Sequence, residues 1–242
     1  MATFVLVPGF WLGAWAWEAV ARDLRAAGHE VHPVTLTGLA ERAAEASPEV
    51  DVETHVRDII AVLEDNDLHD VVLVGHSGGS LPVTCVGDRV PERLRRIVHV
   101  DSGPLPAGMA QIDFHEPDEQ ERTRERVRAE GDGWKLPPPR FDPAEDLVEG
   151  MTAEQLEQVR ARATPQPFGT ATQPLQRSES GATTPQAAIT CTFPPELVRQ
   201  LSTSGHPVFA LMADLDLHHL PTGHWPMFSR PGDLAALLAK IG

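Results

Sequence analysis

The stretch Val71–Val83, VVLVGHSGGSLPV, joins a run of apolar residues to a cluster of glycines around a histidine and a serine. The β-branched run VVLV is typical of a strand that is buried on both faces. An ordinary turn into a helix needs at most one glycine, whereas Gly75, Gly78 and Gly79 all flank this serine. Glycine lets a backbone bend sharply and approach its neighbours closely. The stretch therefore predicts a tight turn that presents the hydroxyl of Ser77 at the end of a buried strand.

Apolar runs alternate with helical patterns on both sides of this turn. Pro33 indicates that the second strand lies at a sheet edge or carries a bulge. The alternation predicts an α/β protein with a mostly parallel sheet of about six strands and helices on both faces. The expected strands are Thr3–Val7, Glu30–Leu36, Val71–Gly75, Leu94–Val100, Ala187–Phe193 and Leu215–Leu220. The expected helices are Trp15–Ala27, Val52–Asn66, Gly78–Val90, Glu196–Ala213 and Pro231–Ile241.

The alternation stops over residues 104–186. Prolines gather there in LPPPRFDP and TPQPFGTATQP, and charged helical segments are expected at Asp118–Glu130 and Thr152–Ala163. A segment this long is no plain connection, so it predicts a helical cap inserted into a core formed by residues 1–103 and 187–242. Within it, Ser178–Gln186 (SESGATTPQ) has the most linker-like composition.

Size and charge narrow the classes of partner. The 242 residues suffice for one domain with a substantial core. The net charge of −15 repels phosphate backbones and anionic lipid, so neither nucleic acid nor a membrane is an expected partner. The N-terminus lacks the basic segment of a secretory signal, and no apolar run is long enough to cross a bilayer, so a cytoplasmic location is expected. A homodimer is compatible with the sequence.

Metal and cofactor chemistry finds little support in the sequence. Cys85 and Cys191 give neither a disulfide framework nor a metal-ligand spacing. His218 and His219 are neighbours on an expected strand, where adjacent side chains point to opposite faces. The loop after the first strand has no G-x-G-x-x-G pattern for a dinucleotide. We therefore expect no metal and no organic cofactor.

A serine hydroxyl is a weak nucleophile at neutral pH and needs a base within hydrogen-bonding reach. His224, in the turn LPTGHWPM after the last expected strand, is expected to be that base. A carboxylate at the end of another strand would orient the imidazole. Asp101 fits best because it ends the apolar run IVHVD, and Glu196, which follows the next strand, is the second choice.

A developing oxyanion needs backbone N–H donors. The amide of Gly78 is expected to be one donor, because it directly follows the serine. The other is expected from the loop VPGFWLGAW, where Gly9 permits a turn and the amide of Phe10 can point inward, with the amide of Trp11 as the alternative. Gly9, Trp11 and three further residues are expected to contact the substrate. These three are His76, Trp134 and Trp225. Trp134 belongs to the cap, and we expect it to form the pocket with Leu136 and Phe141.

Four segments carry a resemblance to a known family. They are LVPGFWLGAWAWEAVARDLRAAGHEVHPVTLTGLAER, VVLVGHSGGS, IVHVDSGPLPAG and LPTGHWPMFSRP. Together they resemble the α/β-hydrolase-fold serine esterases, in the branch that includes the plant methylesterases, the hydroxynitrile lyases and related bacterial esterases. The order of the candidate residues, with the serine first and the histidine near the C-terminus, is the order of this fold.

The chain also departs from the pattern of that branch. Relatives commonly carry a larger residue after the nucleophile, so Gly78 is expected to leave open space beside Ser77. Hydroxynitrile lyases of this type have a lysine directly after the catalytic histidine, and Trp225 at that place disfavours cyanohydrin chemistry. Many relatives place their acid after the strand that matches AAITCTF, where this chain has no aspartate. The choice between Asp101 and Glu196 therefore stays open at the level of sequence.

The resemblance and the site residues imply a serine hydrolase. The expected reaction is cleavage of a carboxylic ester of a small or medium, apolar substrate through an acyl-enzyme intermediate. Hydrolysis of an amide, a lactone or a carbon–carbon bond by the same residues is the alternative within enzymes. A non-catalytic small-molecule receptor built on the same fold is the alternative from another class.

Overall fold

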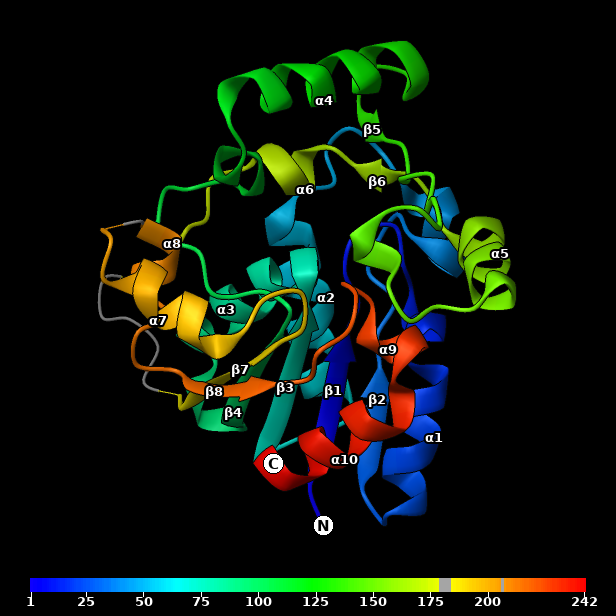
Figure 1. Cartoon of the computed structure of the whole chain (residues 1–242). Coiled ribbons are helices and arrows are strands. Elements are labelled where there is room, and N and C mark those ends of the chain that lie inside the picture. The colour runs from blue at the N-terminus through cyan, green and yellow to red at the C-terminus, as the bar shows by residue number, and fades with distance from the viewer. Residues whose placement is uncertain (179–183, 206) are drawn as a thin grey trace.

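The computed structural model describes residues 1–178, 184–205 and 207–242. Its main feature is a sheet in the order β2-β1-β3-β4-β7-β8, in which every neighbouring pair of strands is parallel (Figure 1). Strand β2 lies at an edge, as Pro33 indicated, and β3, which leads to Ser77, lies in the interior. The strands are β1 (Thr3–Val7), β2 (Glu30–Pro33), β3 (Val71–His76), β4 (Leu94–Val100), β7 (Gln186–Thr190) and β8 (Asp216–His219).

Helices cover both faces of this sheet, which confirms the predicted fold class. On β1, Phe4 and Leu6 belong to one buried cluster, whereas Val5 and Val7 belong to another. This alternation is the two-residue period of a strand buried on both sides. Helices α1 (Glu18–Ala26) and α10 (Pro231–Ile241) contribute to the first cluster. Helices α2 (Val52–Asp65) and α3 (Ser80–Arg89) contribute to the second.

Some expected elements differ in their bounds. The helix expected over Glu196–Ala213 is two helices, α7 (Pro195–Ser202) and α8 (Pro207–Ala210). Gly205 lies between them at a φ of 84°, and Pro207 lacks the N–H that a continuous helix requires. The helix expected from Trp15 begins instead as a 3₁₀ turn, η1 (Ala14–Trp17). The fifth expected strand ends at Thr190, because the next two N–H groups turn toward Asp101.

Most of the chain from residue 104 to residue 178 lies over the C-terminal ends of the strands (Figure 1). Both charged helices expected there are present, as α4 (Pro117–Glu130) and α5 (Ala153–Arg162). Of the linker-like stretch Ser178–Gln186, residues 179–183 lie outside the described residues. The other elements of this segment are η5 (Gln111–Phe114), β5 (Lys135–Leu136), η6 (Asp146–Val148), β6 (Gln166–Pro167), antiparallel to β5, and α6 (Gly169–Thr172).

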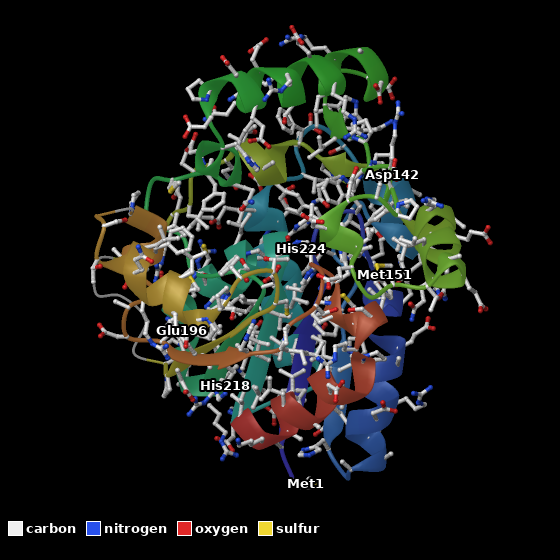
Figure 2. The ribbon with its side chains drawn as sticks, in the orientation of Figure 1. Met1, Asp142, Met151, Glu196, His218 and His224 are labelled. Atoms are coloured by element: carbon white, nitrogen blue, oxygen red, sulfur yellow. The ribbon has the colours of Figure 1, made fainter. Side chains whose placement is uncertain are left out.

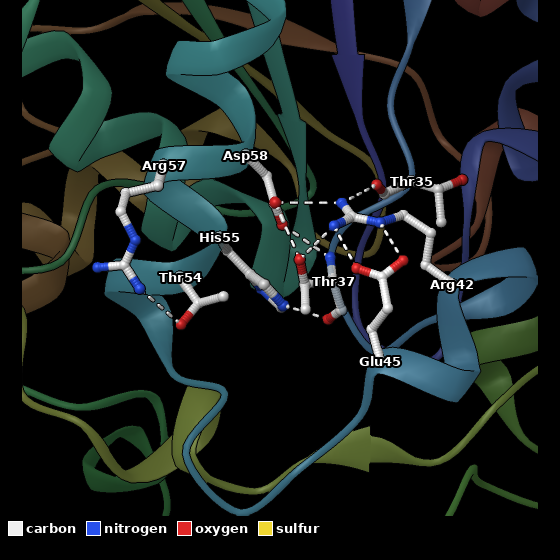
Figure 3. Close-up of polar contacts among 8 residues, drawn as sticks. All are labelled: Thr35, Thr37, Arg42, Glu45, Thr54, His55, Arg57 and Asp58. Atoms are coloured by element: carbon white, nitrogen blue, oxygen red, sulfur yellow. Dashed lines mark hydrogen bonds and ion pairs between the residues drawn. The ribbon is translucent and has the colours of Figure 1, made fainter.

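A polar cluster fastens the chain after β2 to helix α2 (Figure 3). Thr37 donates to the Asp58 carboxylate from its backbone N–H at 2.7 Å and from its hydroxyl at 2.9 Å. Arg42 lies 3.1 Å from the same carboxylate and forms a second ion pair with Glu45 at 2.7 Å. The buried ring of His55 hydrogen-bonds the Thr37 carbonyl oxygen at 3.0 Å. The cluster therefore joins the chain after β2, including the 3₁₀ helix η2 (Ala40–Glu45), to helix α2.

No helix in residues 1–178, 184–205 and 207–242 is long and apolar enough to cross a membrane.

Candidate active site

Ser77 occupies the sharp turn between β3 and α3 that the glycines predicted. It adopts a φ of 49°, in the left-handed region that a non-glycine residue rarely enters. A Cβ atom at Gly75 would lie 2.6 Å from the Val83 side chain of α3. The glycine therefore allows the helix to fold back against the strand, and the serine itself carries the backbone strain.

The structure brings Ser77, His224 and Asp101 into one hydrogen-bonded row. The Ser77 hydroxyl lies 2.8 Å from Nε2 of His224, and Nδ1 of His224 lies 2.6 Å from Oδ2 of Asp101. With Nδ1–H donating to the carboxylate, Nε2 is free to accept the serine proton. Figure 2 shows His224 between the sheet and the segment that covers it.

Asp101 is held as an ionised carboxylate. Its side chain is 1% exposed, and its Oδ1 accepts backbone N–H groups from Cys191 at 2.8 Å and Thr192 at 3.0 Å. Burial alone would raise the pKa of Asp101, but hydrogen bonds from His224 and from these two N–H groups hold it below its ordinary value. Glu196 lies on α7 away from His224 (Figure 2), with its side chain exposed and paired with Arg199. Of the two carboxylates considered, only Asp101 therefore contacts the histidine.

The backbone of His224 is held on both sides. Its N–H donates to the Leu147 carbonyl oxygen at 2.7 Å, and its carbonyl oxygen accepts from Nε2 of His76 at 2.7 Å. His76 is fully buried, and burial and the neighbouring His224 lower its pKa to about 3, so its ring is neutral at physiological pH. His76, which we expected to bind substrate, thus contacts the candidate base instead. Nothing in the sequence pointed to Leu147, because it comes from the short 3₁₀ helix η6, far from His224 along the chain.

One hydrogen bond distinguishes the two alternative oxyanion donors of the first loop, the amides of Phe10 and Trp11. The Trp11 N–H donates to Oε1 of Gln166 at 2.9 Å, so this amide is already engaged. In the part of the chain that the structure describes, the Phe10 N–H has no such acceptor. Phe10 also lines the same cavity as Ser77. Of the two alternatives, the amide of Phe10 is therefore the one available to a ligand.

The open space expected beside Gly78 is absent. A Cβ atom at Gly78 would lie 2.4 Å from two carbons of the Phe10 ring. The aromatic ring from the first loop therefore occupies the place that a side chain after the nucleophile would take. The expectation of a roomier pocket was wrong, because it considered residue 78 without the loop that packs on it.

A cavity of about 490 Å³ opens onto Ser77, Asp101 and His224. Of the residues expected to contact substrate, Trp11, Trp225 and Leu136 line this cavity. Gly9, His76, Trp134 and Phe141 are not among the described residues of its wall. The Trp134 ring instead carries the Lys135 ammonium group, 4.7 Å from its centroid. Phe141 is buried against Trp225. Aromatic and apolar residues that the sequence did not single out complete the wall, among them Phe114, Phe168, Phe193, Phe209 and Met212.

A metal centre finds no candidate in the described ranges. No group of three or more histidine, cysteine, aspartate or glutamate residues lies together within residues 1–178, 184–205 and 207–242.

Comparison with known proteins places the chain in a family. The profile of the alpha/beta hydrolase family matches residues 4–237, and the chain belongs to that family. This match confirms the resemblance to the α/β-hydrolase-fold esterases. Two of the proteins described next are named as an esterase and a putative methylesterase.

The carbendazim-hydrolysing esterase of Nocardioides sp. (strain SG-4G) is 44% identical over 102 residues, or 42% of this chain and 42% of that protein. The aligned part is thus less than half the length of this relative. The putative chloroplastic methylesterase 14 of Arabidopsis thaliana is 26% identical over 261 residues, covering 98% of this chain and 71% of that protein. An extracellular α/β-hydrolase from a Paenibacillus species shares the fold, with a TM-score of 0.80, 22% identity and coverage of 100% and 99% of the two chains.

Proposed function

We propose that this protein is a serine esterase that hydrolyses a carboxylic ester of a small or medium, apolar substrate through an acyl-enzyme intermediate. The observation that carries the proposal is the row of Ser77, His224 and Asp101, joined at 2.8 and 2.6 Å and open to a cavity. Relatives named as esterases and methylesterases support ester cleavage as the reaction.

The hydrogen bonds define the proton path of the proposed mechanism. As the Ser77 Oγ attacks the ester carbonyl carbon, its proton passes to Nε2 of His224, and Asp101 stabilises the imidazolium without taking a proton itself. The amides of Phe10 and Gly78 donate to the oxyanion. The leaving alkoxide then takes the proton from Nε2. Water repeats the sequence on the acyl-enzyme, which releases the carboxylic acid and restores the serine.

The character of the cavity supports an apolar substrate. Its wall is mostly aromatic and aliphatic, so burial of apolar groups there is favourable at about 25 cal/mol per Å². A volume of about 490 Å³ is suited to a small or medium molecule. Amide, lactone and carbon–carbon bond hydrolysis would use the same three residues, and the names of the relatives favour the ester among them.

The test is hydrolysis of p-nitrophenyl esters of increasing acyl length by the wild-type chain and by Ser77→Ala. We expect turnover by the wild type and a loss on the order of 10⁴-fold or more in the variant, because the variant has no nucleophile. Equal rates for the two proteins would refute the proposal. Tight binding of the ester by the folded wild type without any turnover would favour the non-catalytic receptor.

A further inference from the structure

Phe10 and Gly78 come from different loops, and the Phe10 ring occupies the space that a side chain at position 78 would need. Phe10 follows β1, and Gly78 follows the serine at the end of β3. A Cβ atom at position 78 would lie 2.4, 2.4 and 3.0 Å from three carbons of the Phe10 ring. Real Cβ atoms do not approach other atoms this closely, so the ring and a side chain at position 78 exclude one another.

The ring is held in this place from several sides. It meets the Trp11 ring edge-to-face, with centroids 5.9 Å apart. The Trp11 N–H in turn donates to Gln166 on β6, which pairs with β5. Phe10 also packs against the buried cluster that contains Leu105 and Val208. Because its neighbours fix the ring, it forms a stiff wall rather than a side chain that a substrate can push aside.

This wall lies next to the candidate nucleophile, because the ring packs over Gly78, which directly follows Ser77, and lines the same cavity as the serine. The leaving oxygen must face Nε2 of His224, which supplies its proton, and the carbonyl oxygen must face the amides of Phe10 and Gly78. The acyl chain takes the remaining direction, and its α-carbon is bonded to the carbonyl carbon. Since the Phe10 ring packs over Gly78 beside Ser77 and lines the same cavity, substituents on that α-carbon face this ring.

We propose that the Phe10 side chain determines acyl specificity by excluding branches at the acyl α-carbon, in the role that a side chain at position 78 would otherwise take. This inference rests on the proposed function. It assigns to Phe10 a side-chain role that is separate from the backbone role of its amide. Substitution by alanine or leucine retains that amide N–H.

The experiment compares p-nitrophenyl butyrate with p-nitrophenyl isobutyrate, which have the same composition and leaving group and differ only in α-branching. The measured quantity is the ratio of kcat/KM for butyrate to kcat/KM for isobutyrate, and intrinsic reactivity cancels when variants are compared. We expect Phe10→Ala to lower this ratio by about tenfold, as removal of a steric block on one methyl group does. Phe10→Leu, which keeps an apolar side chain of moderate size, should give an intermediate ratio.

Position 78 provides the reciprocal test. Adding Gly78→Ala to Phe10→Ala returns a methyl group to the vacated space, so the ratio should rise again toward the wild-type value. Phe193→Ala is the matched control, because it removes another ring from the same cavity wall. It should leave the ratio within about twofold of the wild type, since general enlargement of a pocket does not select against branching at one carbon.

Two results would overturn the inference while leaving the proposed esterase intact. One is Ser77-dependent hydrolysis with an unchanged ratio in both Phe10→Ala and Phe10→Leu. The other is an equal fall of the ratio in Phe193→Ala. A wild-type chain that hydrolyses neither isomer nor p-nitrophenyl acetate would contradict the proposed function itself, and this inference with it.

Discussion

His76 and Ser77, neighbours in the chain, contact the same histidine at different points. The Ser77 hydroxyl lies 2.8 Å from Nε2 of the His224 ring, and Nε2 of His76 lies 2.7 Å from the His224 carbonyl oxygen. One short turn thus supplies the candidate nucleophile and holds the backbone of its base. Two predictions concern single residues that contact His224.

The first concerns the identity of the acid. Asp101→Asn should lower kcat about 10³- to 10⁴-fold, because an amide does not stabilise the imidazolium and favours the wrong tautomer of His224. Glu196→Gln is the matched control, since Glu196 is exposed and contacts Arg199. Its ester hydrolysis should equal that of the wild type. A comparable loss in Glu196→Gln, or full activity in Asp101→Asn, would be incompatible with the assignment.

The second concerns the positioning role of His76. His76→Leu removes the donor to the His224 carbonyl oxygen and should lower kcat by about 10- to 100-fold through misplacement of the base. KM should change little, because His76 does not line the described cavity. His76→Gln retains a side-chain N–H donor and should recover much of the rate. If the two variants behave alike, or if only KM changes, His76 does not position the base.

At the scale of elements, the sequence predicts best where burial is continuous. The runs at β1 and β3 are apolar on both faces and could be placed within one or two residues. The end of β7 could not, because Cys191 and Thr192 direct their N–H groups to a carboxylate 90 or more positions earlier. Local composition carries no signal of such a contact.

The cluster of Figure 3 gives a prediction for one segment. Asp58 accepts two hydrogen bonds from Thr37 and faces Arg42, and its side chain is 14% exposed. Asp58→Asn should therefore lower the free energy of unfolding by about 1–3 kcal/mol, measured by urea denaturation. Glu45→Gln removes the other, half-exposed partner of Arg42 and should cost less than about 1 kcal/mol. Equal losses would mean that the buried carboxylate does not anchor this segment.

At the scale of the whole molecule, buried histidines link stability to pH. His99 lies within β4, is fully buried and bonds Gln186 at 3.0 Å. Burial lowers its pKa from an ordinary 6.5 to about 4. Between pH 6.5 and pH 4 the unfolded chain binds a proton at His99 that the folded chain does not. The contribution of His99 to the free energy of unfolding is therefore complete above pH 6.5 and is lost as the pH falls toward 4.

His99→Gln should therefore make stability less dependent on pH. Between pH 7 and pH 5 the wild type should lose about 2 kcal/mol more than the variant, because that proton is no longer taken up on unfolding. Urea denaturation at the two pH values measures the difference. His69→Gln, at an exposed position, serves as the control and should follow the wild type. A variant with the wild-type dependence on pH would show that His99 is not responsible.

The molecule as a whole also shows where prediction from sequence stops. The family, a parallel sheet of about six strands and the candidate partners of Ser77 could be inferred, because each depends on a local motif or on a strand end. The choice between Asp101 and Glu196 could not. The wall of the cavity could not, because Phe10, Phe168 and Met212 meet there from distant segments. The space expected at Gly78 was wrong for the same reason, since the Phe10 ring fills it from another loop.

A fluorophosphonate reacts covalently with an activated serine, so it measures whether Ser77 is a nucleophile that His224 activates. Intact mass spectrometry should show the addition of one phosphonyl group to the wild-type chain, located at Ser77 by peptide mapping. Ser77→Ala should show none, and His224→Ala should react at least about 100-fold more slowly, because the hydroxyl then lacks its base. A folded wild-type chain that does not react, or a Ser77→Ala variant that reacts equally fast, would mean that Ser77 is not an activated nucleophile.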